Sequence, residues 1–424
     1  VAGLGHILGY VGKMTEEDLK NNPDYRPSYQ IGKSGLEIIY EKNLRGLAGL
    51  LEVEVDSKGR QQRQLSATNP LPGNNLYLSL DAQLEEKMYE ALAAQVQAAN
   101  SPGGAAVALN PKTGQVLGMV SYPSFDNNIF SSSEVEEKYQ ELMNDPSKPM
   151  FNRAVSGTYP SGSIIKPVIA AAGLQDGVIT ENTTINAPGE IKVGNWTYPD
   201  WKVHGLTDVR KAIAESVNIF FYAVAGGWDK IKGLGVEKLD GYLVKFGFGA
   251  KTGLDLPGEA AGLVPDPAWK EKNKKEIWYL GDTYHLGIGQ GDFLVTPLQM
   301  AQAISAIANN GELLKPRFVT KITDKDGRLV QEYQKEVVRN NFIDPQNLQI
   351  VREGMRLAVT AGSAKRLSDL PAAAAAKTGT AQFGDQGKTH AWMASFAPYN
   401  DPQIVIVALV EQGGEGYATA GPVV

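Results

Sequence analysis

The sequence predicts an α+β fold in which helices cover the faces of an antiparallel sheet. Two pairs of apolar runs, at residues 104–121 and 392–412, each surround a short polar turn, a pattern typical of β-hairpins. Between them lies a stretch with helical periodicity, of which residues 297–311 are the most apolar part. Strands at both ends of a helical middle therefore indicate one antiparallel sheet with helices packed against it.

The first part of the chain is expected to be a small separate module. Residues 1–74 are rich in glycine, asparagine and charged residues, and their apolar runs are short. The segment "NPLPGNN" at 69–75 has the composition of a turn or linker. We therefore predict an N-terminal module at 1–74 and a larger domain at 75–424.

Two helices of the larger domain can be placed with their ends. Residues 77–101 predict a strand and then a helix that Asp81 caps, with apolar residues every four positions at Leu84, Met88, Leu92 and Val96. Thr296 is expected to cap the helix at 297–311, Pro297 to occupy its first position, and Gly311 to end it.

Composition excludes several classes of protein. The 424 residues carry a net charge of −6, which is not the footprint of a nucleic-acid-binding protein. The longest aliphatic run is "IVIVALV" at 404–410, far shorter than the roughly 20 residues of a membrane-spanning helix. The absence of cysteine excludes disulfides and thiolate metal sites. Because residue 1 is valine, we expect that a preceding segment, such as a signal or an anchor, has been removed.

The first candidate for chemistry is Ser163 with Lys166 in "SGTYPSGSIIKPVIAAAG". Pro167 is tolerated only in the first turn of a helix, so Ser163 is expected at a helix N-terminus, where developing negative charge is favoured. Spacing of three places the lysine amine on the same face as the hydroxyl. Flanking isoleucines favour a desolvated lysine with a lowered pKa, which could serve as a base. The alternative is a capping serine beside a lysine that extends to solvent.

Two further motifs follow. Ser216 and Asn218 lie in "ESVNIFF" and could both project into a cleft, although polar residues before an apolar run are usually helix caps. Lys-Thr-Gly occurs at 112–114, 251–253 and 377–379, and the first of these is expected to be a hairpin turn. The third, in "AAAAAKTGTAQF", suits an edge strand along which a substrate backbone could pair.

In this order, the three motifs resemble the signature of the penicillin-binding proteins and class A β-lactamases. The spacing selects the Lys-Thr-Gly at 377–379. The segments "YPSGSIIKP", "GIGQGDFLVTPLQMAQAISAIANNG" and "AAKTGTAQF" are similar to class B transpeptidases. "HAWMASFAPYNDPQIVIVALVEQGGEG" is most similar to the elongation-specific subfamily, and "GKSGLEIIYEKNLRG" resembles the N-terminal module of the class. The resemblance implies a penicillin-binding transpeptidase domain with a helical subdomain, behind a pedestal-like or dimerisation-like module.

The resemblance also implies an activity, that of a peptidoglycan D,D-transpeptidase acting on stem peptides that end in D-Ala-D-Ala. Ser163 would attack the carbonyl between the two D-Ala residues while Lys166 takes its proton. Ser216 would relay a proton to the leaving amine, and Asn218 would position Lys166 and the substrate amide. β-Lactam antibiotics would acylate the same serine.

Binding of the substrate is expected to fall to the third motif. The resemblance implies that the backbone N–H groups of Ser163 and Thr380 form an oxyanion hole. It implies that the terminal carboxylate is held by Lys377, Thr378, Gly379 and Thr380. We also expected the positive charge of Lys377 to lower the pKa of Lys166 across the cleft.

The family context implies partners and a location. A membrane-embedded glycosyltransferase and a scaffold protein of the rod complex are the expected protein partners. The chain would lie outside the cytoplasmic membrane, held by one N-terminal anchor that this sequence lacks.

Other functions remain open from the sequence alone. A division-specific class B transpeptidase, a D,D-carboxypeptidase, a β-lactamase and a non-catalytic β-lactam sensor would use the same residues. Some relatives hold zinc near the second motif with the help of a cysteine, and Asp200, His204 and Asp208 lie in that region. Because this chain has no cysteine, we expect neither a metal nor another cofactor. A serine hydrolase with a Gly-x-Ser-x-Gly turn is excluded, since that motif is absent from the sequence.

Overall fold

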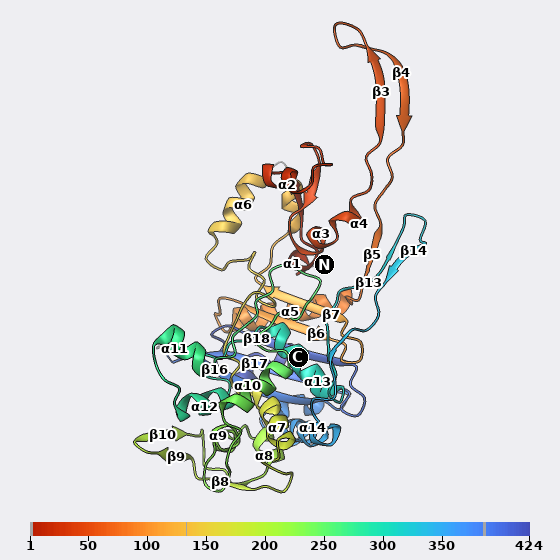
Figure 1. Ribbon diagram of the computed structural model, residues 1–424. Helices are drawn as coiled ribbons and strands as arrows, with labels where there is room; N and C mark the ends of the chain where they lie inside the picture. The colour runs from red at the N-terminus through yellow and green to blue at the C-terminus, as the bar shows by residue number, and fades with distance from the viewer. Residues whose placement is uncertain (1–2, 133, 385–386) are drawn as a thin grey trace.

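The computed structural model describes residues 3–132, 134–384 and 387–424, so the first two residues of the predicted module lie outside it. At its centre is a five-stranded antiparallel sheet in the order β16-β17-β18-β6-β7 (Figure 1). Its strands are β6 Gly104–Leu109, β7 Val116–Tyr122, β16 Ala375–Phe383, β17 Lys388–Ala397 and β18 Ile404–Val410. Both predicted hairpins, β6–β7 and β17–β18, are confirmed.

The two faces of the sheet bury separate cores. In β6, Val107 and Leu109 belong to the larger core, whereas Ala106 and Ala108 belong to the smaller one. This alternation follows from the period of two along a strand. Helix α13 Pro297–Ala308 packs on the face of the larger core, and α5 Ala82–Ala98 packs on the opposite face. The predicted α+β class is therefore confirmed.

The caps of these two helices agree with the sequence analysis. The carboxylate of Asp81 accepts hydrogen bonds from the N–H groups of Gln83 and Leu84 at the start of α5. Thr296 caps α13, and a proline occupies its first turn. The last residue of α13 is Ala308, three positions before the predicted end. Gly311, with φ of +102°, closes the helix by donating its N–H to the carbonyl of Ala306 at 2.8 Å.

A helical subdomain adjoins the sheet at the end away from the N-terminal module (Figure 1). Its central helices are almost entirely buried: α7 Lys166–Gln175 and α9 Asn218–Gly226. The other helices of this region are α8 Val209–Ala214, α10 Val236–Lys245, α11 Pro267–Lys274, α12 Leu280–Gly287 and α14 Pro345–Thr360. Its short strands are β8 Ile185–Ala187, β9 Glu190–Val193, β10 Trp196–Pro199 and β11 Gly205–Thr207.

The N-terminal module is built from short elements and one long hairpin that extends from the body of the molecule (Figure 1). The hairpin is formed by β3 Leu50–Val55 and β4 Gln61–Thr68. The other elements are α1 Gly5–Leu8, β1 Val11–Lys13, α2 Glu16–Asn21, β2 Gln30–Gly32, α3 Gly35–Ile39 and α4 Glu41–Leu44.

A segment from the larger domain also packs against this module. The rings of Tyr10 and Phe130 stack with centroids 3.5 Å apart, and Asn127 donates to the carbonyl of Gly9 at 2.7 Å. This segment contains η1 Asn127–Ser131 and α6 Val135–Asn144. The predicted boundary at 74 and 75 thus separates the chain in sequence, but residues from both sides of it meet in space.

The remaining elements connect these parts. Strand β13 Val319–Thr323 pairs with β5 Asn75–Leu78 on one side and with β14 Leu329–Glu332 on the other. The others are β12 Leu313–Leu314, β15 Val337–Arg339, η2 Gly162–Ile165, η3 Lys365–Asp369, α15 Gly416–Thr419 and η4 Gly421–Val423. Across residues 3–132, 134–384 and 387–424, none of the helices has the length and apolar character needed to span a membrane.

Candidate active site

Ser163 lies in a tight turn at the start of a buried helix. It is half-buried in the 3₁₀ turn η2, which leads directly into α7. Gly162 before it has φ of +54° and donates its N–H to the carbonyl of Gly289 at 2.8 Å. Trp392 on β17 donates its indole N–H to the carbonyl of Pro160 at 3.0 Å. The loop that carries the serine is thus anchored on two sides.

Lys166 joins the first motif to the second. Its side chain is fully buried, and its Nζ donates to Asn218 Oδ1 at 2.6 Å and to Ser216 O at 2.7 Å. The hydroxyl Oγ of Ser216 lies 3.2 Å from the same nitrogen. The lysine therefore does not extend to solvent, and the residues predicted from two distant motifs share one hydrogen-bonded cluster.

The second motif has an unusual backbone. Ser216 has φ of +59°, a left-handed conformation that is uncommon for a residue other than glycine and strains the chain. This turn directs both the carbonyl and the hydroxyl of Ser216 toward Lys166. Asn218 follows as the first residue of α9. The pair is therefore placed by a turn and a helix start, rather than by a loop alone.

The third motif lies against the serine turn. It occupies β16, which is the terminal strand of the central sheet within the described residues. A Cβ atom on Gly379 would lie 3.1 Å from the backbone nitrogen of Ile164 and 2.8 Å from its Cγ2. A Cβ on Gly162 would lie 2.8 Å from the carbonyl oxygen of Thr380. Only glycine permits this approach, which places Ser163 beside Thr380.

The side chains of this motif differ in accessibility. Lys377 is fully buried, and its Nζ donates to the carbonyl of Thr378 at 2.8 Å. The hydroxyl of Thr378 donates to Ser363 Oγ at 2.8 Å. Thr380 is half-buried and donates to Glu415 Oε2 at 3.0 Å. Each of the three side chains therefore has a protein partner.

Lys166 and Lys377 are both fully buried, and burial favours the neutral form of each amine. Burial lowers the pKa of Lys166 from 10.5 to about 7, and the negative charge of Asp200 opposes this shift. Burial, followed by the charge of Lys166, holds the pKa of Lys377 well below its usual range. Lys166 has more acceptors and a nearby carboxylate, so Lys377 is the first of the two to lose its proton.

One of the two expected causes of the low pKa of Lys166 is confirmed and the other is not. We expected loss of water and the positive charge of Lys377 to act together, and burial is the largest cause. The charge of Lys377 is not among the causes, and the second contribution is instead the opposing negative charge of Asp200. The prediction that Lys166 has a much lower pKa than a free lysine agrees with the structure, because its side chain is fully buried and its Nζ lies 5.5 Å from the ring centroid of Phe221 on α9.

The other two Lys-Thr-Gly sequences have structural places. Residues 112–114 form the turn between β6 and β7, as predicted. In the second, the hydroxyl and the N–H of Thr252 donate to Glu259 Oε2 at 2.6 and 2.8 Å, which closes a loop. This loop also contacts the N-terminal module, because Tyr40 donates its hydroxyl to Asp255 Oδ2 at 2.9 Å.

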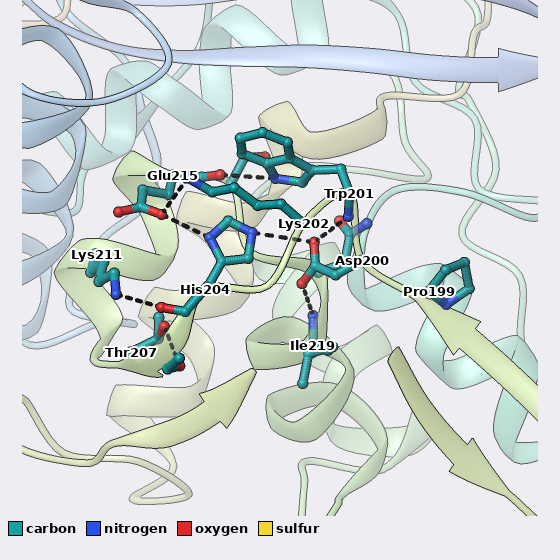
Figure 2. Close-up of polar contacts among 12 residues, drawn as sticks. Pro199, Asp200, Trp201, Lys202, His204, Thr207, Lys211, Glu215 and Ile219 are labelled. Carbon is teal, nitrogen blue, oxygen red and sulfur yellow. Dashed lines mark hydrogen bonds and ion pairs between the residues drawn. The ribbon is translucent and has the colours of Figure 1, made fainter. Parts of the chain in front are cut away.

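The residues weighed as metal ligands do not form a metal site. Asp208 caps α8 by accepting from the N–H of Lys211 at 2.8 Å and so faces its own helix. His204 Nδ1 lies 2.7 Å from Glu215 Oε2, and His204 Nε2 lies 3.6 Å from Asp200 Oδ1 (Figure 2). The described part of the chain contains no cluster of three acidic, histidine or cysteine side chains arranged to hold a metal.

Two polar residues next to the site were missed by the sequence analysis or given another role. Asp200 was considered only as a metal ligand, yet its Oδ2 accepts from the N–H of Ile219 at the start of α9. A signal existed in the sequence, since Val217 cannot cap the helix that follows it. Glu415, the partner of Thr380, carried no such signal.

Comparisons with known proteins agree with this geometry. Residues 104–424 match the penicillin binding protein transpeptidase domain, and residues 2–78 match the penicillin-binding protein dimerisation domain. The peptidoglycan D,D-transpeptidase MrdA of Escherichia coli K12 is 37% identical over 98% of this chain and 68% of its own length. MrdA of Haemophilus influenzae is 35% identical over 99% of this chain and 66% of its own length. This chain thus spans about two thirds of the length of these relatives.

Solved structures give the same result. A complex of penicillin-binding protein 2 and MreC from Helicobacter pylori has a TM-score of 0.85 at 34% identity, covering 99% of this chain and 76% of that one. Penicillin-binding protein 2 of Pseudomonas aeruginosa in complex with WCK 5153 has a TM-score of 0.82 at 34% identity, covering 100% and 88%. The resemblance inferred from the motifs is confirmed: the chain belongs to the penicillin-binding protein transpeptidase family and is similar to its penicillin-binding protein 2 members.

Proposed function

We propose that this chain is the catalytic part of a peptidoglycan D,D-transpeptidase that cross-links stem peptides during cell-wall elongation. The observation that best supports it is the bonding of Lys166, whose Nζ meets Asn218 Oδ1 at 2.6 Å and Ser216 O at 2.7 Å. Such a lysine, fully buried and with a pKa of about 7, is suited to exchange protons at neutral pH.

In the first step, the hydroxyl of Ser163 attacks the carbonyl carbon between the two D-Ala residues, and neutral Lys166 accepts its proton. The C–N bond then breaks, an ester to Ser163 remains, and terminal D-Ala leaves as an amine. Ser216, 3.2 Å from Lys166 Nζ, returns a proton to that amine. An amine of a neighbouring strand then attacks the ester and restores the free serine.

Two groups stabilise the charge that develops on the carbonyl oxygen. The backbone N–H groups of Ser163 and Thr380 are proposed as the oxyanion hole, each worth roughly 3–4 kcal/mol. The close approach of Gly379 to Ile164 supports this pairing, because it brings the two backbones together. The substrate carboxylate would take the hydroxyls of Thr378 and Thr380 from their present partners and would favour a protonated Lys377.

The partners and the location are proposed from what is known of the relatives. The solved complex with MreC is that of the Helicobacter pylori protein, and a related solved assembly is described as a peptidoglycan synthase complex. We propose that this chain likewise contacts a scaffold protein and a membrane-embedded glycosyltransferase through its N-terminal module. We also propose that it works on the outer side of the cytoplasmic membrane, in the full-length protein behind one anchor.

Acylation by a fluorescent penicillin tests the proposal. We expect one covalent adduct per chain, detected by intact-mass spectrometry, and none in Ser163→Ala. Release of D-Ala with formation of a cross-linked product, from a pentapeptide donor and an acceptor strand, separates a transpeptidase from a β-lactam sensor. An adduct that persists in Ser163→Ala would show that the nucleophile is a different residue.

A further inference from the structure

Asp200 has an unusual place beside the second motif. Its side chain is completely buried. Its Oδ2 accepts a hydrogen bond from the N–H of Ile219 at 2.9 Å, and its Oδ1 accepts from the N–H of Trp201 at 2.9 Å (Figure 2). Burying a carboxylate is costly unless it is well compensated. Here the positive N-terminal end of α9 supplies part of that compensation.

The carboxylate of Asp200 acts as the cap of helix α9, because the residue at the N-cap position of the helix has no hydrogen-bond acceptor in its side chain. Val217 occupies the N-cap of α9 and makes no side-chain cap. The N–H of Ile219 is instead satisfied by Asp200, 19 residues earlier in the chain. Asn218 lies between Val217 and Ile219 as the first residue of the helix, and its Oδ1 accepts a hydrogen bond from Lys166. The carboxylate thus fixes the turn that presents Asn218 to the lysine.

The same loop also holds the other end of the second motif. Glu215 precedes the strained residue Ser216, and its Oε2 lies 2.7 Å from Nδ1 of His204. Its carbonyl accepts the indole N–H of Trp201 at 3.2 Å. Residues on both sides of the Ser-Val-Asn sequence are therefore attached to residues 200–204.

The charge of Asp200 acts on the same cluster. It opposes the effect of burial on the pKa of Lys166, and with burial it raises the pKa of Tyr222 on α9. Other ionisable groups near Lys166, Tyr222 and Asp200 include Lys377 on β16, Tyr198 on β10, and His204, whose Nε2 is 3.6 Å from Asp200. That distance is too long for a hydrogen bond. Asp200 is thus the acidic group whose charge opposes the effect of burial on Lys166.

We propose that Asp200 is a positioning residue for the acyl-transfer reaction: its carboxylate holds the first turn of α9 and with it Asn218, whose Oδ1 accepts from Lys166. The negative charge of Asp200 also opposes the effect of burial on the pKa of Lys166. The inference rests on the proposed function, since it assigns Asp200 a role in the reaction of Ser163. It gives this buried carboxylate a task that needs no metal ion.

The test separates the hydrogen bond from the charge. In Asp200→Asn, the amide oxygen can still accept from Ile219, but the charge is lost. We expect the pH midpoint of acylation to fall by roughly one unit, while the plateau rate falls less than tenfold. In Asp200→Ala both are lost, and the plateau should fall at least tenfold. Adding Val217→Thr to Asp200→Ala supplies a local cap, which should recover the plateau but not the midpoint.

Asp208→Asn is the matched control. It makes the same chemical change at the cap of α8, and it should leave the midpoint of acylation unchanged. Circular dichroism and thermal unfolding establish that each variant is folded. If Asp200→Asn does not fold, Asp200→Glu replaces it; this variant keeps the charge and should keep the midpoint while the plateau falls.

The outcomes distinguish this inference from the proposed function. If the unmodified chain is not acylated at all, the proposed function fails and the inference fails with it. If the unmodified chain is acylated but a folded Asp200→Asn has the same midpoint, Asp200 does not act on Lys166 and the inference is overturned. A midpoint that moves upward, or that moves equally in Asp208→Asn, also overturns it, as does a shifted midpoint in Asp200→Glu.

Discussion

The pH dependence of acylation is the most demanding test of the role given to Lys166. Burial lowers the pKa of this lysine from 10.5 to about 7, a change worth about 5 kcal/mol at 1.36 kcal/mol per unit. At pH 7 about half of the chains would then hold a neutral Lys166, and at pH 5 about 1% would. If neutral Lys166 is the base, the acylation rate should be about 100-fold lower at pH 5 than on its plateau above pH 8.

The measurement is the single-turnover rate of acylation by a fluorescent penicillin between pH 5 and 10. Lys166→Arg is the companion variant, because arginine keeps the charge but has no accessible neutral form. It should lose most acylation at every pH if it folds. A wild-type rate that is flat from about pH 6 to 10, or normal acylation by Lys166→Arg, would refute the assignment. Lys166 would then be an orienting charge.

Three further outcomes are expected. Lys166→Met should remove a pH dependence of stability: because burial lowers the pKa of Lys166 from 10.5 to about 7, the unmodified chain carries a cost of about 5 kcal/mol at pH values below 7 that fades toward pH 10.5, and pH-dependent urea unfolding should show this change in wild type but not in the variant. Gly379→Ala should leave the chain folded but slow acylation at least tenfold, because its Cβ meets Ile164 at 2.8 Å, and an unchanged rate would contradict the assigned contact. A chain beginning at Asn75 should still be acylated. It should unfold at a lower temperature, because Phe130 loses its stacking partner Tyr10. A folded chain that is not acylated would show that the N-terminal module is part of the active site.

One expectation about Lys377 changes with the structure. From the sequence, removal of its charge in Lys377→Ala should raise the pH midpoint of acylation. Because burial already favours the neutral amine, we now expect the midpoint to stay within about 0.3 units while carboxylate binding weakens. The pH profile of this variant, compared with wild type, decides the matter, and a clear upward shift would show that Lys377 is charged before ligand binds.

The parts of the fold that sequence alone could predict are those in which local rules and burial agree. Helix α13 has a threonine cap and a first-turn proline, and its mostly apolar residues are all buried, so local signals and burial favour the same structure. The two hairpins follow from alternating runs around polar turns. The serine turn was placed correctly because Pro167 admits only a helix start.

The parts that escaped prediction depend on contacts between distant segments. Phe130 packs on Tyr10, and the N–H of Ile219 donates to Asp200, but neither contact produces a repeating pattern in the sequence. The order in which the two lysines lose their protons depends on how many acceptors each finds after folding. Spacing could identify both amines as candidates, but only the three-dimensional surroundings assign their charge.

We expect the enclosed amine of Lys377 to couple the binding of a carboxylate ligand to the uptake of a proton. Burial lowers the pKa of this amine well below its usual range, and its Nζ donates to the neighbouring carbonyl of Thr378. The negative charge of a bound carboxylate favours the protonated form of the Lys377 amine. The proton that the amine takes up must come from the buffer. Calorimetric binding heats should therefore depend on the ionisation enthalpy of the buffer. Ligands without the carboxylate should cause no such uptake and should bind more weakly before any bond to Ser163 forms.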